Sequence, residues 1–311
     1  MYMSILKLPL GIAVSSMEKG DIKFIKSHKT FGNFNVKKDL SYIVDDSDEH
    51  KLDIYTSPEK SNGITLFYVH GGAYVYGSKN YQSIFASWFV NKGFTVVVPN
   101  YRLAQKDGSV SVMDQVLDLL EALKFVEENK VYYGIKTTNL FLMGDSAGGH
   151  LCMMLEILLK DKDVQQYYGI KDVPTFDLKG IALNSTMYDF EGVVSLAKSM
   201  LFKKGIKWML SSKYIDDEFV KMNSPRYHYQ KGFKPSPLFA STATHDFFNS
   251  QTMRLKRDAD ELGIDLTYLF ESSPKKEIGH VYNHFHFEDE EGKKCNEMME
   301  EFFYKYSVVA E

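Results

Sequence analysis

Short apolar runs recur along the chain with amphipathic segments between them, and this alternation constrains the fold more than any other feature. Continuous apolar runs of this length are typical of strands buried on both faces of a parallel sheet. They lie at residues 64–70, 94–101, 139–144, 179–186, 236–242 and 266–270. Apolar residues at helical spacing predict helices over about 81–91, from Ser111 onward, and over about 147–160, 249–262 and 289–306. Strands that alternate with helices predict an α/β fold, in which helices flank a mostly parallel central sheet.

Three segments depart from this alternation. Residues 37–56 alternate polar and apolar side chains, which predicts two antiparallel strands ahead of the parallel ones. Residues 190–234 carry many aromatic and methionine side chains between two sheet strands, and they predict a helical insertion over the ends of the sheet. We expect this insertion and residues 1–36 to form a cap, within a single domain that spans residues 1–311.

Composition narrows the class of protein. A formal net charge of -4 gives no basic surface for nucleic acid, so no nucleic-acid partner is expected. No apolar run approaches the length of a membrane span. The apolar patch near the N-terminus is interrupted by Pro9 and Gly11, which favours a mature cytoplasmic N-terminus over a signal peptide. The two cysteines, Cys152 and Cys295, fit a reducing compartment, and a cytoplasmic location is expected.

The segment GDSAGG, from Gly144 to Gly149, matches the pattern G-x-S-x-G between a predicted strand and a predicted helix. A sharp turn there presents Ser146 at its tip, because the small residues Gly144 and Gly148 let strand and helix approach closely. The start of the following helix directs backbone N–H groups toward the place where negative charge develops. Ser146 is therefore predicted as a nucleophile; the alternative is a glycine-rich turn that only packs.

The segment HGGAY, from His70 to Tyr74, follows an earlier buried strand. Its glycines allow a loop whose backbone N–H groups point into a cavity. We expect Gly71 to form the bend and Gly72 and Ala73 to donate, together with the amide of Ala147, to an oxyanion. His70 is expected to order this loop by hydrogen bonding rather than to act as a base.

A catalytic acid is expected after the nucleophile in the chain order serine, acid, histidine. Asp246 follows the predicted strand 236–242 and is the favoured acid. Asp189 is the rival, since it follows the strand 179–186. A solvated loop aspartate or a helix N-cap is the structural alternative for Asp246.

Three histidines after the last predicted strand compete for the role of base: His280, His284 and His286. His280 lies between Gly279 and an apolar-aromatic pair, a setting that suits a loop histidine over the serine, and His284 is the main alternative. The spacing of the three could also indicate metal ligands, but no further ligand constellation accompanies them, so no metal or organic cofactor is expected.

Over residues 40–305 the chain resembles the hormone-sensitive-lipase-like branch of the α/β-hydrolase carboxylesterases. The resemblance rests on HGGAYVYGS, NYRLAQ, GDSAGG, ATHD and GHVYN in the right order. It implies an α/β-hydrolase fold with a helical cap, and it implies Ser146 as nucleophile, Asp246 as acid and His280 as base. The implied oxyanion donors are Gly72, Ala73 and Ala147.

This chain departs from the family pattern at three places. Ala73 replaces the third glycine of the loop, YRLAQKD lacks the usual proline and glutamate, and HVYN replaces the usual His-Gly-Phe. Arg102, in the YRLA segment, is expected to form a structural ion pair rather than to contact substrate.

These patterns together predict a serine carboxylesterase that hydrolyses short- to medium-chain esters through an acyl-enzyme on Ser146. Its partner is a small-molecule ester, and a homodimer stays open because the sequence shows no interface. Within the enzyme class the alternatives are a deacetylase or hydroxycinnamoyl esterase of acylated sugars, sterols or plant phenolics, and an amidase. A non-catalytic small-molecule receptor on the same fold is the alternative outside it.

Overall fold

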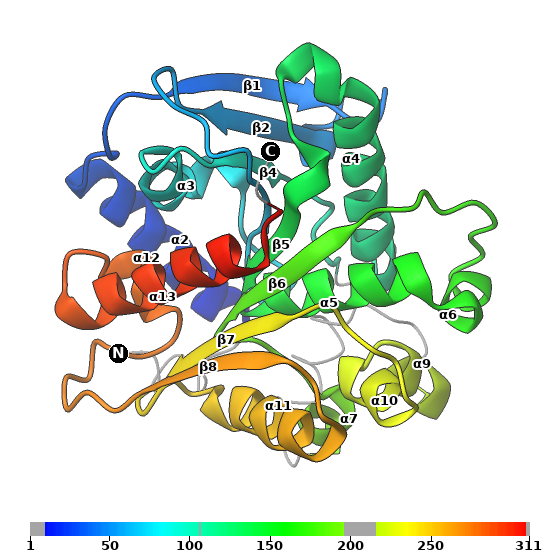
Figure 1. Ribbon diagram of the computed structural model, residues 1–311. Helices are drawn as coiled ribbons and strands as arrows, with labels where there is room; N and C mark the ends of the chain where they lie inside the picture. Colours follow the sequence, from blue (N-terminus) through cyan, green and yellow to red (C-terminus); the bar gives the residue numbers. More distant parts are fainter. Residues whose placement is uncertain (1–9, 106, 196–215, 309–311) are drawn as a thin grey trace.

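The computed structural model describes residues 10–105, 107–195 and 216–308, and an eight-stranded sheet forms its centre (Figure 1). The strand order is β1-β2-β4-β3-β5-β6-β7-β8. Strands β1 and β2, and β2 and β4, pair antiparallel, whereas all other neighbouring strands are parallel. The predicted α/β fold is confirmed. The strands are β1 (Asn35–Ser41), β2 (Lys51–Thr56), β3 (Thr65–Val69), β4 (Thr95–Pro99), β5 (Leu140–Asp145), β6 (Leu178–Asn184), β7 (Leu238–Ala243) and β8 (Leu266–Glu271).

Helices cover both faces of the sheet and bury a separate apolar core on each (Figure 1). Side chains alternate across each strand, so that in β3 Phe67 and Val69 join one core, whereas Leu66 and Tyr68 join the other. The first core contains residues of α4 and α5, and the second contains residues of α3 and α13. The predicted helices are α3 (Ser83–Val90), α4 (Val112–Tyr133), α5 (Ala147–Lys160), α11 (Asn249–Leu262) and α13 (Glu290–Tyr306).

Local sequence signals set the ends of α4. The side chain of Ser111 accepts from the amide of Asp114, and the Asp114 carboxylate accepts from the Ser111 amide, so the two residues form a capping box at the start of the helix. The helix ends at Tyr133 and is capped by Gly134, whose φ of 69° lies in the left-handed region that glycine adopts without strain.

Further helices occupy the segments expected to form a cap, and others lie at places where the sequence predicted none. The structure places α7, α9 and α10 within residues 190–234, and residues 196–215 of that segment lie outside the described part of the chain. Helix α2 lies within residues 1–36, the other segment expected to contribute to the helical cap, whereas α6 and α12 were not predicted. Between residues 10 and 308, as far as they are described, no helix has the length and apolar character to cross a bilayer. The helices are α2 (Leu10–Ser27), α6 (Lys162–Tyr167), α7 (Phe190–Ser195), α9 (Asp217–Met222), α10 (Pro225–Gln230) and α12 (Tyr282–Phe285).

Gly148, in the first turn of α5, lies directly against the end of β3. A Cβ atom there would lie 2.1 Å from the carbonyl oxygen of Val69 and 2.6 Å from that of His70. Because both contacts are to backbone, we expect Gly148→Ala to lower the free energy of unfolding by about 3 kcal/mol. Chemical denaturation measures this change.

Gly20→Ala is the matched control for this prediction. Gly20 lies inside α2, and a Cβ atom there meets nothing within 4 Å. Alanine favours the helix, so this variant should be more stable than wild type by about 0.5–1 kcal/mol. Equal effects of the two substitutions would contradict the close approach of α5 to β3.

Candidate active site

Ser146 lies at the tip of a sharp turn between β5 and α5. Strand β5 ends at Asp145 and α5 begins at Ala147, so a single residue makes the connection. Ser146 has a φ of 51° and a ψ of -117°, a conformation that non-glycine residues rarely adopt. Its amide donates to the carbonyl oxygen of Asn184 at 2.8 Å, which ties the turn to β6. The turn therefore holds the hydroxyl at the carboxyl end of the parallel strands.

His280 connects this serine to a buried carboxylate. Its Nε2 atom lies 2.9 Å from Ser146 Oγ, and its Nδ1 atom lies 2.8 Å from Asp246 Oδ1. If Nδ1 carries the proton and donates to Asp246, Nε2 is left with a lone pair that can accept from the serine hydroxyl. Serine, histidine and aspartate thus form one continuous hydrogen-bonded chain across three separate loops.

Asp246 is held as a charged acceptor. It is only 3% exposed, and it also accepts from the hydroxyl of Thr242 at 2.7 Å and the amide of Phe248 at 2.8 Å. Burial acts to raise the pKa of Asp246, but the interaction with His280 and these hydrogen bonds outweigh it, so the pKa lies below its ordinary value. An ionised Asp246 can therefore orient the imidazole at neutral pH.

Asp189, the rival acid, has other partners. Its carboxylate accepts from the amide of Gly192 at 3.0 Å and forms ion pairs with Arg254 and, at 3.8 Å, Arg226. It does not contact His280 in the described structure. Asp189 is therefore a structural ion-pair residue, and Asp246 alone of the two faces the histidine.

The three C-terminal histidines point in different directions. His284 lies in the core, with Nδ1 3.0 Å from the hydroxyl of Tyr68 and its ring stacked on Phe85 at 3.6 Å. His286 binds Asp289 at 2.8 Å. Burial lowers the pKa of His284 to about 3, so this ring is neutral. The part of the chain that the structure describes holds no group of three or more side chains placed to bind a metal ion.

The loop after β3 lies beside the serine, since Gly71 and Gly72 line the same cleft as Ser146. The amide of Gly71 donates to Asp145 Oδ1 at 3.0 Å, so Gly71 forms the bend and is not a free donor. Within the described residues, the backbone amides of Gly72, Ala73 and Ala147 donate no hydrogen bond. Ala73 has a φ of 53°, a left-handed conformation that the third glycine of the family pattern would adopt with less strain.

His70 orders this loop, as predicted. Its Nδ1 atom lies 2.8 Å from the carbonyl oxygen of Gly71, and its ring stacks on Tyr101 with centroids 4.4 Å apart. Burial lowers the pKa of His70 to about 4. A neutral ring that donates to the loop backbone fits a positioning role.

Beside the loop lies a cluster of hydrogen-bonded side chains that the sequence did not predict. The hydroxyl of Tyr68 lies 2.9 Å from Asp145 Oδ1, 2.9 Å from Gln82 Oε1 and 3.0 Å from His284 Nδ1. Because the carboxylate is the strongest acceptor, Tyr68 donates to Asp145, and His284 donates from Nδ1 to the tyrosine oxygen. Burial raises the pKa of Asp145 to about 6, although its bonds to Tyr68 and Gly71 act to lower it. Tyr68 lies within an apolar run, so no sequence signal distinguished it from an ordinary core residue.

We expect Tyr68→Phe to lower the free energy of unfolding by about 2 kcal/mol, because it leaves Asp145 and His284 with one partner fewer in a buried place. Activity should fall about tenfold as the hold on the Gly71 amide weakens. Tyr74→Phe is the control: this phenol is also fully buried, and its hydroxyl has no partner among the described residues. Thermal unfolding and kcat of both variants measure the difference, and equal stabilities would contradict the role given to Tyr68.

Arg102 lies outside this site and forms the predicted structural ion pair. Its Nε atom donates to Asp118 Oδ2 at 2.9 Å, and its Nη2 atom donates to Asp118 Oδ1 at 2.6 Å. Asp118 belongs to α4 and is buried. The pair therefore ties the segment after β4 to this helix.

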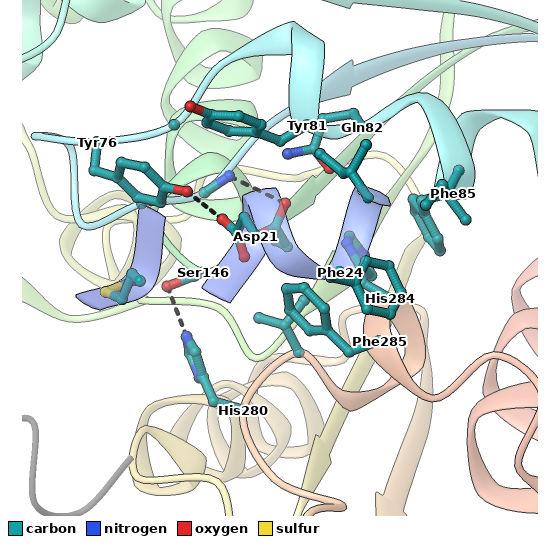
Figure 2. A pocket seen from close by; sticks show the side chains of 18 residues that line it. Asp21, Phe24, Tyr76, Tyr81, Gln82, Phe85, Ser146, His280, His284 and Phe285 are labelled. Carbon is teal, nitrogen blue, oxygen red and sulfur yellow. Dashed lines mark hydrogen bonds between the residues drawn. The ribbon is translucent and has the colours of Figure 1, made fainter. Parts of the chain in front are cut away.

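A cleft of about 80 Å³ opens beside Ser146 and His280 (Figure 2). Helices α2, α3 and α12 supply an apolar wall of this cleft. Helix α2 also contributes Asp21, which lines the same cleft as the serine. The apolar wall is formed by Met17, Phe24, Ile25, Ile84, Phe85 and Phe285.

Known proteins resemble the chain in both sequence and structure. Arylacetamide deacetylase of Bos taurus is 33% identical over 155 residues, which cover 46% of this chain and 38% of that protein. A probable isoprenylcysteine alpha-carbonyl methylesterase of Oryza sativa subsp. japonica is 32% identical over 130 residues, which cover 40% of this chain and 30% of that protein. The chain thus matches less than half the length of either relative.

Among solved structures, esterase B of Lactobacillus rhamnosis superposes with a TM-score of 0.86 at 20% identity, over 98% of this chain and 96% of that one. This likeness confirms the α/β-hydrolase fold. The model of the BD-FAE family matches residues 52–258, which include the loop after β3, the serine turn and Asp246. The chain, with its serine turn and α/β-hydrolase fold, therefore belongs to the BD-FAE family.

Proposed function

We propose that the protein is a serine carboxylesterase that hydrolyses short- to medium-chain esters through an acyl-enzyme on Ser146. The observation that carries this proposal is the chain from Asp246 through His280 to Ser146, with contacts of 2.8 and 2.9 Å. Both contacts have the length of good hydrogen bonds before any substrate is present. The likeness in sequence to a deacetylase and to a probable methylesterase supports acyl transfer at the same kind of site.

The proposed reaction has two steps. In the first, Ser146 Oγ attacks the ester carbonyl carbon while His280 Nε2 accepts its proton, and the amides of Gly72, Ala73 and Ala147 bind the oxyanion. His280 then returns the proton to the departing alcohol, which leaves an acyl group on Ser146. In the second step, water attacks this acyl group by the same route and releases the acid. No metal or organic cofactor takes part in these steps.

The cleft and its surroundings suggest the kind of substrate. A volume of about 80 Å³ beside the serine favours a short acyl chain. Helix α2 supplies several residues of the apolar wall, which fits the prediction that residues 1–36 and 190–234 cap a single domain. A cytoplasmic location stays a prediction, which rests on two free, buried cysteines.

A second candidate function is the deacetylation of aryl amides, and the likeness to arylacetamide deacetylase favours it. The same triad and the same oxyanion donors would act in both reactions. The two differ in the leaving atom, since an aniline nitrogen must be protonated before it can leave.

Hydrolysis of p-nitrophenyl esters from acetate to decanoate tests the proposal, with p-nitroacetanilide beside the acetate as its amide counterpart. We expect kcat/KM to peak at acetate to butyrate, and the ester to be cleaved much faster than the amide. A protein that cleaves the anilide as well as the ester would be assigned as a deacetylase. A protein that is inert on every ester and on the anilide would contradict both functions.

A further inference from the structure

One side of the cleft is polar and acidic, in contrast to its apolar wall (Figure 2). Asp21 projects from α2 into this side, close to Tyr76, Tyr81 and Gln82. Asp145 supplies a second carboxylate. No lysine or arginine belongs to the described lining of the cleft. The proposed mechanism uses none of the side chains of Asp21, Tyr76 or Tyr81.

Asp21 is held in place through one carboxylate oxygen, and the other has no partner among the described residues. The hydroxyl of Tyr76 donates a short hydrogen bond to Oδ2 of Asp21. Within the described structure no donor reaches Oδ1. Partial burial raises the pKa of Asp21, against the effect of the Tyr76 bond. This carboxylate therefore lies in a poorly solvated place where a new donor or a positive charge is favoured.

The aromatic rings beside Asp21 add to this preference. Tyr76 and Tyr81 stack with ring centroids 5.9 Å apart. Tyrosine faces attract cations, and a carboxylate beside them strengthens the attraction. The lysines of α2 do not offset these charges, since Lys19, Lys23 and Lys26 are exposed and line a different surface hollow.

The two sides of the cleft suit the two halves of an ester. Ile84 and Phe85 on the apolar wall are buried, which suits an acyl chain. Asp21, Tyr81 and Gln82 are half-buried, so the polar side is closer to solvent. The alcohol leaves in the first step and needs a route to solvent, so the polar side fits the alcohol half.

We propose that Asp21 is a specificity-determining residue, and that the cleft prefers esters whose alcohol half carries a protonated amine. This inference rests on the proposed esterase function. It involves no covalent step of its own: the carboxylate of Asp21 attracts the ammonium group while the acyl chain lies against the apolar wall.

Two esters of the same shape test the preference in wild type. In 2-(dimethylamino)ethyl butyrate a protonated nitrogen replaces the branching carbon of 3-methylbutyl butyrate. We expect kcat/KM to favour the amino ester by roughly tenfold at low salt, and the ratio to fall as salt is raised, because ions screen partly exposed charges. This measurement needs no variant.

Asp21→Asn removes the charge and keeps the size of the side chain. The ratio of the two kcat/KM values should fall to about one in this variant. Because both esters are measured with the same preparation, this ratio does not depend on how much of the variant is folded. Asp163→Asn is the matched control, since Asp163 is an exposed aspartate on α6 and does not line the cleft. It should keep the wild-type ratio.

The outcomes separate this inference from the proposed function. If wild type cleaves both esters equally well, or if Asp21→Asn keeps the full preference, the role of Asp21 is overturned while the esterase stands. If wild type cleaves neither of these esters nor p-nitrophenyl butyrate, the proposed function itself is overturned.

Discussion

Ser146→Ala and His280→Ala are each expected to lower kcat for p-nitrophenyl butyrate by about 10⁶-fold. The two residues act as one unit: without the imidazole the serine hydroxyl keeps its proton, and without the hydroxyl the imidazole has nothing to activate. Their contact of 2.9 Å is the only one that connects Ser146 to a base in the described structure. The double variant should therefore lose little more activity than either single variant. Steady-state kinetics at substrate saturation measure these losses.

His286→Ala is the matched control, because this histidine binds Asp289 and does not line the cleft. It should keep kcat within a few-fold of wild type. Retained activity in His280→Ala would contradict the assignment of His280 as the base, and His284 would become the next candidate. Since His284 is buried and bonded to Tyr68, its replacement should instead lower stability.

Asp246→Asn is expected to lower kcat by about 10⁴-fold with little change in KM. An asparagine at this place can offer its amide hydrogens to Nδ1, which would leave the proton on Nε2 and the serine without an acceptor. The carboxylate also stabilises the imidazolium that forms when the serine proton moves to His280. The measurement is kcat and KM for the same ester, with circular dichroism to compare the fold.

Asp189→Asn provides the comparison for Asp246→Asn. This change weakens ion pairs with Arg254 and Arg226, so we expect a loss of stability and less than a tenfold loss of kcat. The reverse result, with kcat lost in Asp189→Asn and kept in Asp246→Asn, would contradict the assigned acid.

Much of this architecture follows from sequence patterns that burial imposes. Strands buried on both faces must be apolar along their whole length, so runs such as 139–144 could be located to within two residues. Chain order then limits where the acid and the base can lie, since the ends of successive parallel strands meet at one edge of the sheet. This reasoning selected Asp246 and His280, which the structure brings to Ser146.

Other parts of the site could not be predicted, for physical reasons. Helix α2 contains Gly11 and Gly20, which lower its intrinsic helix propensity, so the sequence predicts no clear helix there. The group formed by Tyr68, Asp145 and His284 joins residues far apart in the chain, and its members resemble core or turn residues when taken singly. Asp21 could not be predicted as a site residue either. It lies on α2, far from Ser146 in the sequence, and no neighbouring residue in the sequence indicates that the two share a cleft.

The most direct test of the central claim is labelling of the protein with an alkyl organophosphonate that reacts with activated serines. The arrangement of His280 and Asp246 predicts one phosphonyl group per chain, located on Ser146 by peptide mass spectrometry, and none in Ser146→Ala. Wild-type protein that stays unlabelled, or that carries the label at another residue, would contradict the assignment of Ser146 as the nucleophile.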